Sequence, residues 1–258
     1  MEFIRIIGSK VLNFSAEFGK ITMLLVNVIR YFPRIIKDKR IVIEQMSVIG
    51  VESLPLVLLI GAFTGAIAAL EATMLFSKFN LIGITRPYLG ASIATAVFTE
   101  LTPVLTALVI AGRVGGAIAA QIGTMKVSEQ IDALEIMAID KDRYLAMPRV
   151  FGAIVMMPIL AVFSNIIALL GALVLVKVKY DFTTYEFLIS MQNFFAMKEI
   201  VISLSKSLIF GGVTALIGCH IGFQTEGGAE GVGNSTVRAF TLSAASILVI
   251  DAIFGYLV

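Results

Sequence analysis

The chain has 258 residues and a formal net charge of +2; 58% of its residues are hydrophobic and 15% are charged. A soluble domain is usually about half apolar and about a quarter charged, so this composition indicates a chain that lies in a lipid bilayer. The net charge is too small to suggest nucleic-acid binding. Because Cys219 is the single cysteine, an internal disulfide is excluded.

Residues 3–32 predict an amphipathic helix that lies along the membrane surface, with its cations toward the headgroups. Charged and amide residues interrupt every long apolar run, and Pro33 ends the helix because its ring cannot continue it. The alternative is a soluble amphipathic helix packed on a partner. We expect no cleaved signal peptide, because a short apolar core with a small-residue cleavage site is missing. The apolar stripe consists of Ile4, Ile7, Val11, Phe14, Phe18, Ile21, Leu25, Val28 and Phe32.

Five later segments are apolar over the roughly 20 residues that a membrane-spanning helix needs. The second and third exceed this minimum, so we expect them to tilt, kink or extend beyond the lipid. The predicted spans are residues 53–77, 88–122, 148–177, 199–221 and 236–257.

The distribution of cations predicts the orientation of the spans. Eight of the twenty Lys and Arg residues lie in the first forty positions, and such residues favour the cytoplasmic side. The N-terminus is therefore expected inside and the C-terminus outside. Residues 78–87 and 178–198 would lie outside, and residues 123–147 and 222–235 would lie inside.

Three pairs of glycines at four-residue spacing mark expected contacts between helices, because a small residue lets another backbone approach closely. The pairs are Gly61 with Gly65, Gly112 with Gly116, and Gly218 with Gly222.

The segment Ala111–Leu134 begins as a small-residue membrane helix and ends as a charged helix too polar to remain in lipid. Over about residues 128–139, Ser128 can cap a helix and Glu129 suits its positive end. We interpret this stretch as a docking helix for a cytoplasmic motor; the alternative is a solvated loop helix. Its two faces are Val127, Ile131, Leu134 and Ala138, and Glu129, Asp132 and Glu135. The candidate docking residues are Ser128, Glu129, Gln130, Ile131, Asp132, Ala133, Leu134 and Glu135.

Ionisable residues within the apolar runs form the second candidate site, because a charge at the bilayer centre costs roughly 2.5–3.5 kcal/mol on insertion scales. Glu100 is the deepest, and Pro103 frees a backbone carbonyl near it. Glu100 is interpreted either as the polar floor of a substrate cavity or as a carboxylate paired with a neighbouring helix. Arg113 and Lys206 are expected to reach toward the membrane surface and to be structural. The remaining ionisable residues of this kind are Glu71 and Asp251.

Other motifs give no sign of catalysis or metal binding. The glycine-rich stretch 227–233 lacks the phosphate-binding pattern of ATPases and predicts a tight turn under the membrane. Cys219 and His220 are adjacent and so diverge on a helix, which gives metal binding little support. No set of nucleophile, base and acid suggests an enzyme, so we expect no catalytic residue, metal or cofactor on this chain.

Three blocks of sequence carry a family resemblance. They are Glu100–Ala107 (ELTPVLTA), the segment 111–134 ending in EQIDAL, and Lys206–Gly211 leading to Gly227–Gly233. Through these blocks, and over nearly all of residues 45–258, the chain resembles the MlaE-type permeases. These are membrane subunits of ABC systems that move phospholipids between bacterial membranes and have relatives in plastid envelopes.

The resemblance implies an all-α homodimeric permease, with an N-terminal interfacial helix and basic connector at 1–44 and five spans at 45–258. A phospholipid cavity would lie at the dimer interface and open toward the periplasm. A cytoplasmic ATPase dimer, which holds ATP and Mg²⁺, would dock on the coupling helix at about 128–139. A periplasmic ring of MCE-domain proteins would sit above, and in bacteria with the full system a STAS-domain protein binds the ATPase. The expected location is the bacterial inner membrane.

Residue by residue, Glu100 and Leu101 match the acidic-Leu pair that lines the family's cavity, and we add Leu70 and Glu71 of the first span as substrate-binding candidates. The chain departs from many members at Thr99, where they have Arg, and at Gln121, where they have Glu. Two rival functions remain at this point. One is a proton-coupled secondary transporter that uses Glu71, Glu100 or Asp251, and the other is a membrane anchor without transport.

Overall fold

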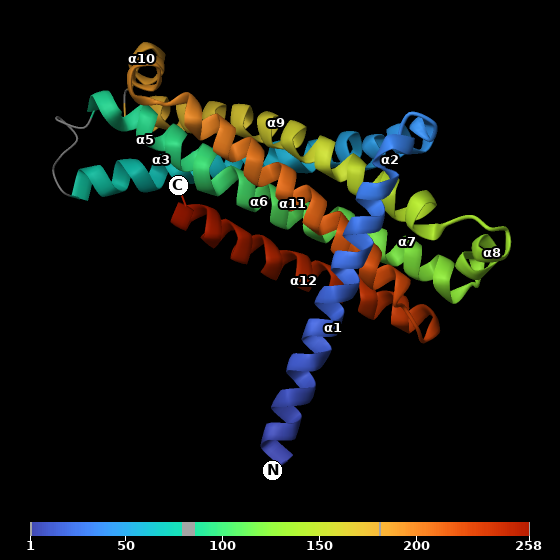
Figure 1. The fold of residues 1–258 in the computed structure, drawn as a ribbon. Helices are drawn as coiled ribbons and strands as arrows, with labels where there is room; N and C mark the ends of the chain where they lie inside the picture. Colours follow the sequence, from blue (N-terminus) through green and yellow to red (C-terminus); the bar gives the residue numbers. More distant parts are fainter. Residues whose placement is uncertain (1, 79–85, 181, 258) are drawn as a thin grey trace. The chain divides into compact units, whose positions relative to one another are not determined.

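The computed structural model describes residues 2–78, 86–180 and 182–257, and these residues are mostly helical with no strand among them (Figure 1). Five helical stretches are long and apolar enough to cross a membrane. Four contain a predicted span in full and the fifth contains all but the last residue of its span, so the all-α membrane fold is confirmed. Most of the predicted connection 78–87 lies outside the described residues. The stretches are Lys39–Lys78, Arg86–Val127, Asp142–Tyr180, Met197–Phe223 and Gly228–Tyr256.

The N-terminal helix forms as predicted. Helix α1 covers Glu2–Tyr31, and the short 3-10 helix η1 (Phe32–Arg34) follows with Pro33 in its first turn. Of the predicted apolar stripe, Val28 is fully buried whereas Phe18 is exposed. The side chains of Ile4, Ile7, Val11 and Phe14 lie outside the described set.

The first span begins earlier than its apolar run predicts. Helix α2 (Lys39–Gly50) continues through the 3-10 turn η2 (Val51–Ser53) into α3 (Leu54–Lys78). Part of the predicted basic connector is therefore helical.

Two wider helical turns interrupt the second span. After the 3-10 turn η3 (Arg86–Tyr88) its order is α5 (Leu89–Ala96), the π-helical segment η4 (Val97–Leu101), α6 (Thr102–Ile110), the π-helical segment η5 (Ala111–Gly115) and α7 (Gly116–Val127). A π-helical turn is rare and occurs often at functional sites. Glu100 lies in η4, so the sequence signal around Pro103 corresponds to a real irregularity of the backbone.

A short helix that the sequence analysis did not foresee follows the third span. The third span consists of the π-helical segment η6 (Asp142–Ala146) and α9 (Met147–Tyr180), and α10 (Thr184–Phe194) comes next. Thr183 caps α10: its hydroxyl accepts the Glu186 N–H at 3.2 Å, and the Glu186 carboxylate accepts the Thr183 N–H at 2.9 Å. The Thr-x-x-Glu spacing of this capping box was the available signal. Helix α10 packs on α5, where the Ser190 hydroxyl accepts the N–H of Ala91 (Figure 1).

The last two spans are α11 (Met197–Phe223) and α12 (Gly228–Leu257). The predicted glycine-rich turn is shorter than expected. Only Gly227 and Gly228 adopt positive φ, at 87° and 67°, a conformation that costs glycine little. The remaining glycines of the stretch already belong to α12, which begins earlier than the predicted span.

The chain divides into two compact units, and each is described by itself. The first unit contains residues 1–45, 111–152 and 212–243, and the second contains residues 46–110, 153–211 and 244–258. A buried apolar cluster that includes Ala119, Ile217 and Ala239 forms part of the first core. The second unit has a larger cluster, which includes Ala69, Val97, Phe98, Ala172 and Phe187.

Within each unit, small residues let helices approach closely, as predicted for the pairs Gly61 with Gly65 and Gly218 with Gly222, whereas a methyl group at Gly112 would meet only the Phe240 ring at 3.5 Å. In the second unit, a methyl group added at Gly65 would lie 1.7 Å from the carbonyl oxygen of Ala168, and one added at Gly61 would lie 2.8 Å from that of Ser164. In the first unit, a methyl group at Gly222 would lie 2.7 Å from Cβ of Ile122. Each contact joins two different helices.

We expect Gly65→Ala to lower the melting temperature of the detergent-solubilised protein, because α3 and α9 would have to separate. Overpacking of this kind costs about 1–3 kcal/mol. Gly255→Ala in α12 is the matched control, since a methyl group there meets nothing within 4 Å. Thermal unfolding followed by size-exclusion chromatography measures both variants, and equal melting temperatures would contradict the close contact.

Candidate functional site

Lys206 is the centre of a polar cluster inside the second unit. Its side chain is only 1% exposed, although it lies in the membrane-spanning helix α11. Its ammonium donates to the carbonyl oxygen of Thr99 at 2.8 Å and to Glu100 at 3.2 Å, and it lies 2.8 Å from Oδ1 of Asp251. The expectation that Lys206 reaches toward the membrane surface is wrong, because three oxygens hold its ammonium in the interior. We call Thr99, Glu100, Lys206 and Asp251 the Lys206 cluster.

The chemistry of proline explains why a cation is useful at this position. Pro103 has no N–H, so it cannot donate to the carbonyl of Thr99, four residues earlier. The ammonium of Lys206 donates to this carbonyl instead, within the π-helical segment η4. The predicted freed carbonyl near Glu100 therefore belongs to Thr99, and its partner comes from a different span.

The two carboxylates of the Lys206 cluster have different surroundings. The Asp251 side chain is 17% exposed, whereas that of Glu100 is 51% exposed. One ammonium faces two carboxylates, so the cluster carries a formal charge of −1. Lys206 and Asp251 are sheltered, whereas Glu100 is half-exposed. The alternative reading of Glu100, a carboxylate paired with a neighbouring helix, is confirmed by its ion pair with Lys206, and its reading as the floor of a substrate cavity stays a prediction.

The other predicted substrate-binding residues are only partly brought together with Glu100. Leu101 packs against the second unit's apolar cluster, which contains Ala69 of the first span. Leu70 is partly buried and Glu71 is exposed. Among the described residues no hydrogen bond or ion pair joins Glu71 to Glu100.

A buried arginine in the first unit also escaped the sequence analysis. Arg149 is 8% exposed, and its guanidinium donates to the carbonyl of Leu145 at 2.8 Å and to the Gln121 side chain at 3.4 Å. The structure thus pairs Gln121 with Arg149. Within the described ranges no group of three or more His, Cys, Asp or Glu residues could hold a metal ion.

The predicted coupling helix is shorter than expected. Helix α8 covers Gln130–Ile136 only. Ser128 does not cap it, because its hydroxyl donates to the carbonyl of Thr124 at 2.7 Å. Glu129, with φ of 59°, occupies the N-cap position without a side-chain capping bond.

A Schellman motif ends α8 before the predicted boundary at 139. Ala138 adopts φ of 56°, and the N–H groups of Ala138 and Ile139 bond to the carbonyls of Glu135 and Leu134. A left-handed residue with this bonding pattern closes a helix. Ala138 therefore follows the end of α8 and is not part of this helix. It does not extend the predicted apolar face.

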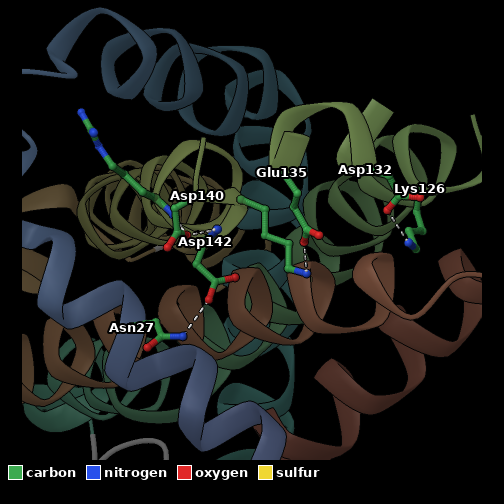
Figure 2. Close-up of polar contacts among 8 residues, drawn as sticks. Asn27, Lys126, Asp132, Glu135, Asp140 and Asp142 are labelled. Atoms are coloured by element: carbon green, nitrogen blue, oxygen red, sulfur yellow. Dashed lines mark hydrogen bonds and ion pairs between the residues drawn. The ribbon is translucent and has the colours of Figure 1, made fainter. Parts of the chain in front are cut away.

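The surface of α8 has exposed carboxylates beside exposed apolar side chains. Asp132 pairs with Lys126 at 2.9 Å, and Glu135 pairs with Lys141 at 2.8 Å (Figure 2). Ile131 is buried, whereas Ile136 is 87% exposed and Met137, which follows the helix, is 61% exposed. An open pocket of about 330 Å³ lies at the end of α8, lined by residues 135 and 138–142. An exposed short helix of this kind can bind another protein.

We expect Lys206→Met to destabilise the protein strongly, because it leaves Asp251, Glu100 and the Thr99 carbonyl without their cation. Removing one partner of a buried ion pair costs about 3–5 kcal/mol, and the exposure of Glu100 reduces this figure. Asp251→Asn should have a smaller effect, and Glu100→Gln the smallest. Melting temperatures in detergent test this order, with Lys198→Met, an exposed change on the same helix, as control. A Lys206→Met protein as stable as the control would contradict the role of the ammonium.

Comparison with known proteins agrees with this architecture. The sequence model of the family described as Permease MlaE matches residues 42–257. A probable ABC transporter permease protein of Synechocystis sp. is 39% identical over 220 residues, which cover 85% of this chain and 82% of the relative. A probable ABC transporter permease protein of Rickettsia bellii is 34% identical and covers 94% and 92% of the two chains.

A plant chloroplast protein is also similar to the chain. The Arabidopsis thaliana protein TRIGALACTOSYLDIACYLGLYCEROL 1, chloroplastic, is 33% identical over 86% of this chain, which corresponds to 63% of the plant protein. The family match extends over more than half of the chain, and the bacterial relatives are matched over most of their own length. The chain therefore belongs to the MlaE permease family and is a multi-pass membrane permease subunit of an ABC transporter.

Proposed function

We propose that this permease moves phospholipid between the inner membrane of a bacterium and periplasmic MCE-domain carriers. The observation that carries the proposal is the Lys206 cluster, which presents the half-exposed carboxylate of Glu100 within an otherwise apolar span. A site that joins a charge to long apolar helices suits a molecule with a polar headgroup and acyl chains. The name of the Arabidopsis relative, which contains that of a diacylglycerol lipid, supports a lipid substrate.

The exposure of Glu100 also supports a homodimer. A charged side chain in a span normally faces a protein partner or a water-filled cavity, because contact with lipid is costly. In our proposal a second copy covers this face, and the lipid occupies a cavity between the two copies, open toward the periplasm. Leu101 and Leu70 would contact the acyl chains, while Glu100 and Glu71 would interact with the polar end.

The ATPase partner of this permease is proposed to dock on α8 at the cytoplasmic face. Exposed carboxylates at Glu129, Asp132 and Glu135, next to the apolar Ile136 and Met137, offer both charge and apolar contact. ATP and Mg²⁺ bind on the ATPase in this proposal, and this chain holds neither. The basic N-terminus supports an orientation with α1 and α8 on the cytoplasmic side and the C-terminus on the periplasmic side.

The transport cycle that we propose couples α8 to the dimer cavity. Closing and opening of the ATPase dimer push α8. Along the chain, α8 follows α7, and α7 is joined through the π-helical segment η5 and α6 to η4, which contains Glu100. The periplasmic ring of MCE-domain proteins would exchange lipid with the cavity. A STAS-domain protein would bind the ATPase.

Glu100→Gln tests the substrate site. The change keeps the size of the side chain and removes its charge, so we expect the protein to fold and phospholipid transport per ATP to fall about ten-fold, equivalent to about 1.4 kcal/mol. Transport is measured in proteoliposomes that contain the permease with its ATPase and the carrier, with mass spectrometry of copurified lipid. Glu199→Gln, in the first turn of α11, is the control. Unchanged transport and lipid content in the Glu100 variant would contradict the assignment.

The double substitution Asp132→Lys with Glu135→Lys tests the docking surface. It reverses two exposed charges, and the surface ion pairs that it breaks are worth only about 0–1 kcal/mol each, so the fold should persist. We expect the ATPase to be lost from the affinity-purified permease. Glu226→Lys with Glu230→Lys makes the same charge change on exposed positions of the other proposed cytoplasmic connection and should retain the ATPase. Retention by both variants would refute docking on α8.

Two rival functions predict different behaviour in the same preparations. A proton-coupled transporter would work in a pH gradient without the ATPase; of its three candidate carboxylates, Glu100 and Asp251 already bind Lys206. A membrane anchor would retain the periplasmic proteins but show no ATP-dependent lipid movement.

A further inference from the structure

Three side-chain contacts tie the N-terminal segment to the four residues 140–143, which connect the coupling helix α8 to the third span. The Asn27 amide donates to Asp142 at 2.7 Å (Figure 2), and the Tyr31 hydroxyl donates to Asp140 at 2.6 Å. Asp38, just before α2, receives two parallel hydrogen bonds from Arg143, each 3.0 Å long. We call these three contacts the N-terminal clasp. All of its residues belong to the first unit.

The geometry of the clasp makes it stronger than an ordinary set of surface contacts. The planar guanidinium of Arg143 meets the Asp38 carboxylate in a two-pronged, charge-assisted arrangement that fixes orientation as well as distance. The Asp38 side chain is 21% exposed and that of Arg143 is 36% exposed, so salt screens this half-buried pair less than a fully exposed one. Nearby, the rings of Phe32 and Phe151 pack edge to face with centroids 5.6 Å apart.

Asp140 serves the clasp and the third span at the same time. Its Oδ1 accepts the N–H groups of Asp142 and Arg143 at 2.9 and 3.2 Å, so it caps the start of that span, while its Oδ2 accepts from Tyr31. Partial desolvation opposes ionisation of Asp140, but these hydrogen bonds outweigh it and lower the pKa of Asp140; the same bond raises the pKa of Tyr31. The stabilisation from this contact is therefore present at neutral pH and declines as the pH falls through the lowered pKa of Asp140.

Residues 140–143 are also connected to α8 by an ion pair. Lys141 pairs with Glu135 of α8 at 2.8 Å (Figure 2), and its ammonium lies 5.9 Å from the ring centre of Phe223, the last residue of α11. At the other side of the clasp, α1 is joined to α12 by an ion pair between Glu17 and Arg238. A displacement of α8 would therefore act on residues 140–143 and, through them, on α1.

We propose that the N-terminal clasp makes α1 a moving part of the coupling apparatus, so that the ATPase stroke received at α8 displaces the amphipathic helix together with residues 140–143. Asp38, Asp140, Asp142 and Arg143 are then positioning residues for energy coupling. This inference rests on the proposed docking of the ATPase at α8.

Labels on the two sides of the clasp test the inference in the purified complex with its ATPase. In a Cys219→Ala background, a spin label is placed either at Met23→Cys on α1, which is 70% exposed, or at Tyr144→Cys, which is 44% exposed. We expect the spectra of both labels to change when ATP and Mg²⁺ are added. With Asp38→Arg, the change at position 23 should fall to less than half while that at position 144 remains.

Charge exchange and matched controls separate the clasp from general damage. The pair Asp38→Arg with Arg143→Asp should restore the response at position 23, and Lys37→Glu, an exposed neighbour of Asp38, should leave it intact. Tyr31→Phe, which removes one hydrogen bond, should reduce it by less than Asp38→Arg does.

The outcomes that oppose the inference are distinct. A full response at position 23 in the Asp38→Arg complex, or no recovery on charge exchange, would overturn the inference and leave the docking proposal standing. A silent label at position 144 in the parent complex, with the ATPase still bound, would refute docking at α8 and this inference with it.

Discussion

A single ammonium group inside the second unit joins the span that carries it to two other spans. Lys206 on α11 meets the Thr99 carbonyl and the Glu100 carboxylate on the second span and the Asp251 carboxylate on the fifth. A carbonyl without a hydrogen bond and a charge without a counterion are both costly away from water. The way these three spans pack is therefore constrained by one residue, and that residue also determines how Glu100 is presented.

The irregular backbone of the second span is closely connected with this arrangement. Proline at 103 removes one helical hydrogen bond, and the π-helical turn before it changes the direction in which Glu100 points. Close packing elsewhere in the unit, where glycines of α3 and α9 meet facing backbones, leaves the helices little freedom to adjust. A carboxylate held by a rigid surround can keep a fixed orientation toward a substrate.

The first unit shows a different use of polar contacts. Its ion pairs lie mostly at the surface, where each is weak alone, but several converge on the short connection between α8 and the third span. Convergence matters because a rigid connection transmits displacement, whereas a flexible loop would absorb it. The capping role of Asp140 and the Schellman motif that ends α8 both contribute to that rigidity.

The sequence by itself determined the solvent, the number of spans and the family, because these depend on composition, apolar length and short motifs that are local in the chain. It also located the irregularity at Pro103, close helix contacts at glycines and the short charged helix that follows the second span. The Thr-x-x-Glu spacing of the capping box at α10 is also a local signal, but the sequence analysis did not predict this helix from it. Only the tertiary structure decided that Lys206 lies buried, that Gln121 faces Arg149, and that α1 is tied to residues 140–143. Each of these features depends on residues that are far apart in the sequence. Helix packing determines which side chains meet, and a local sequence pattern does not predict that packing.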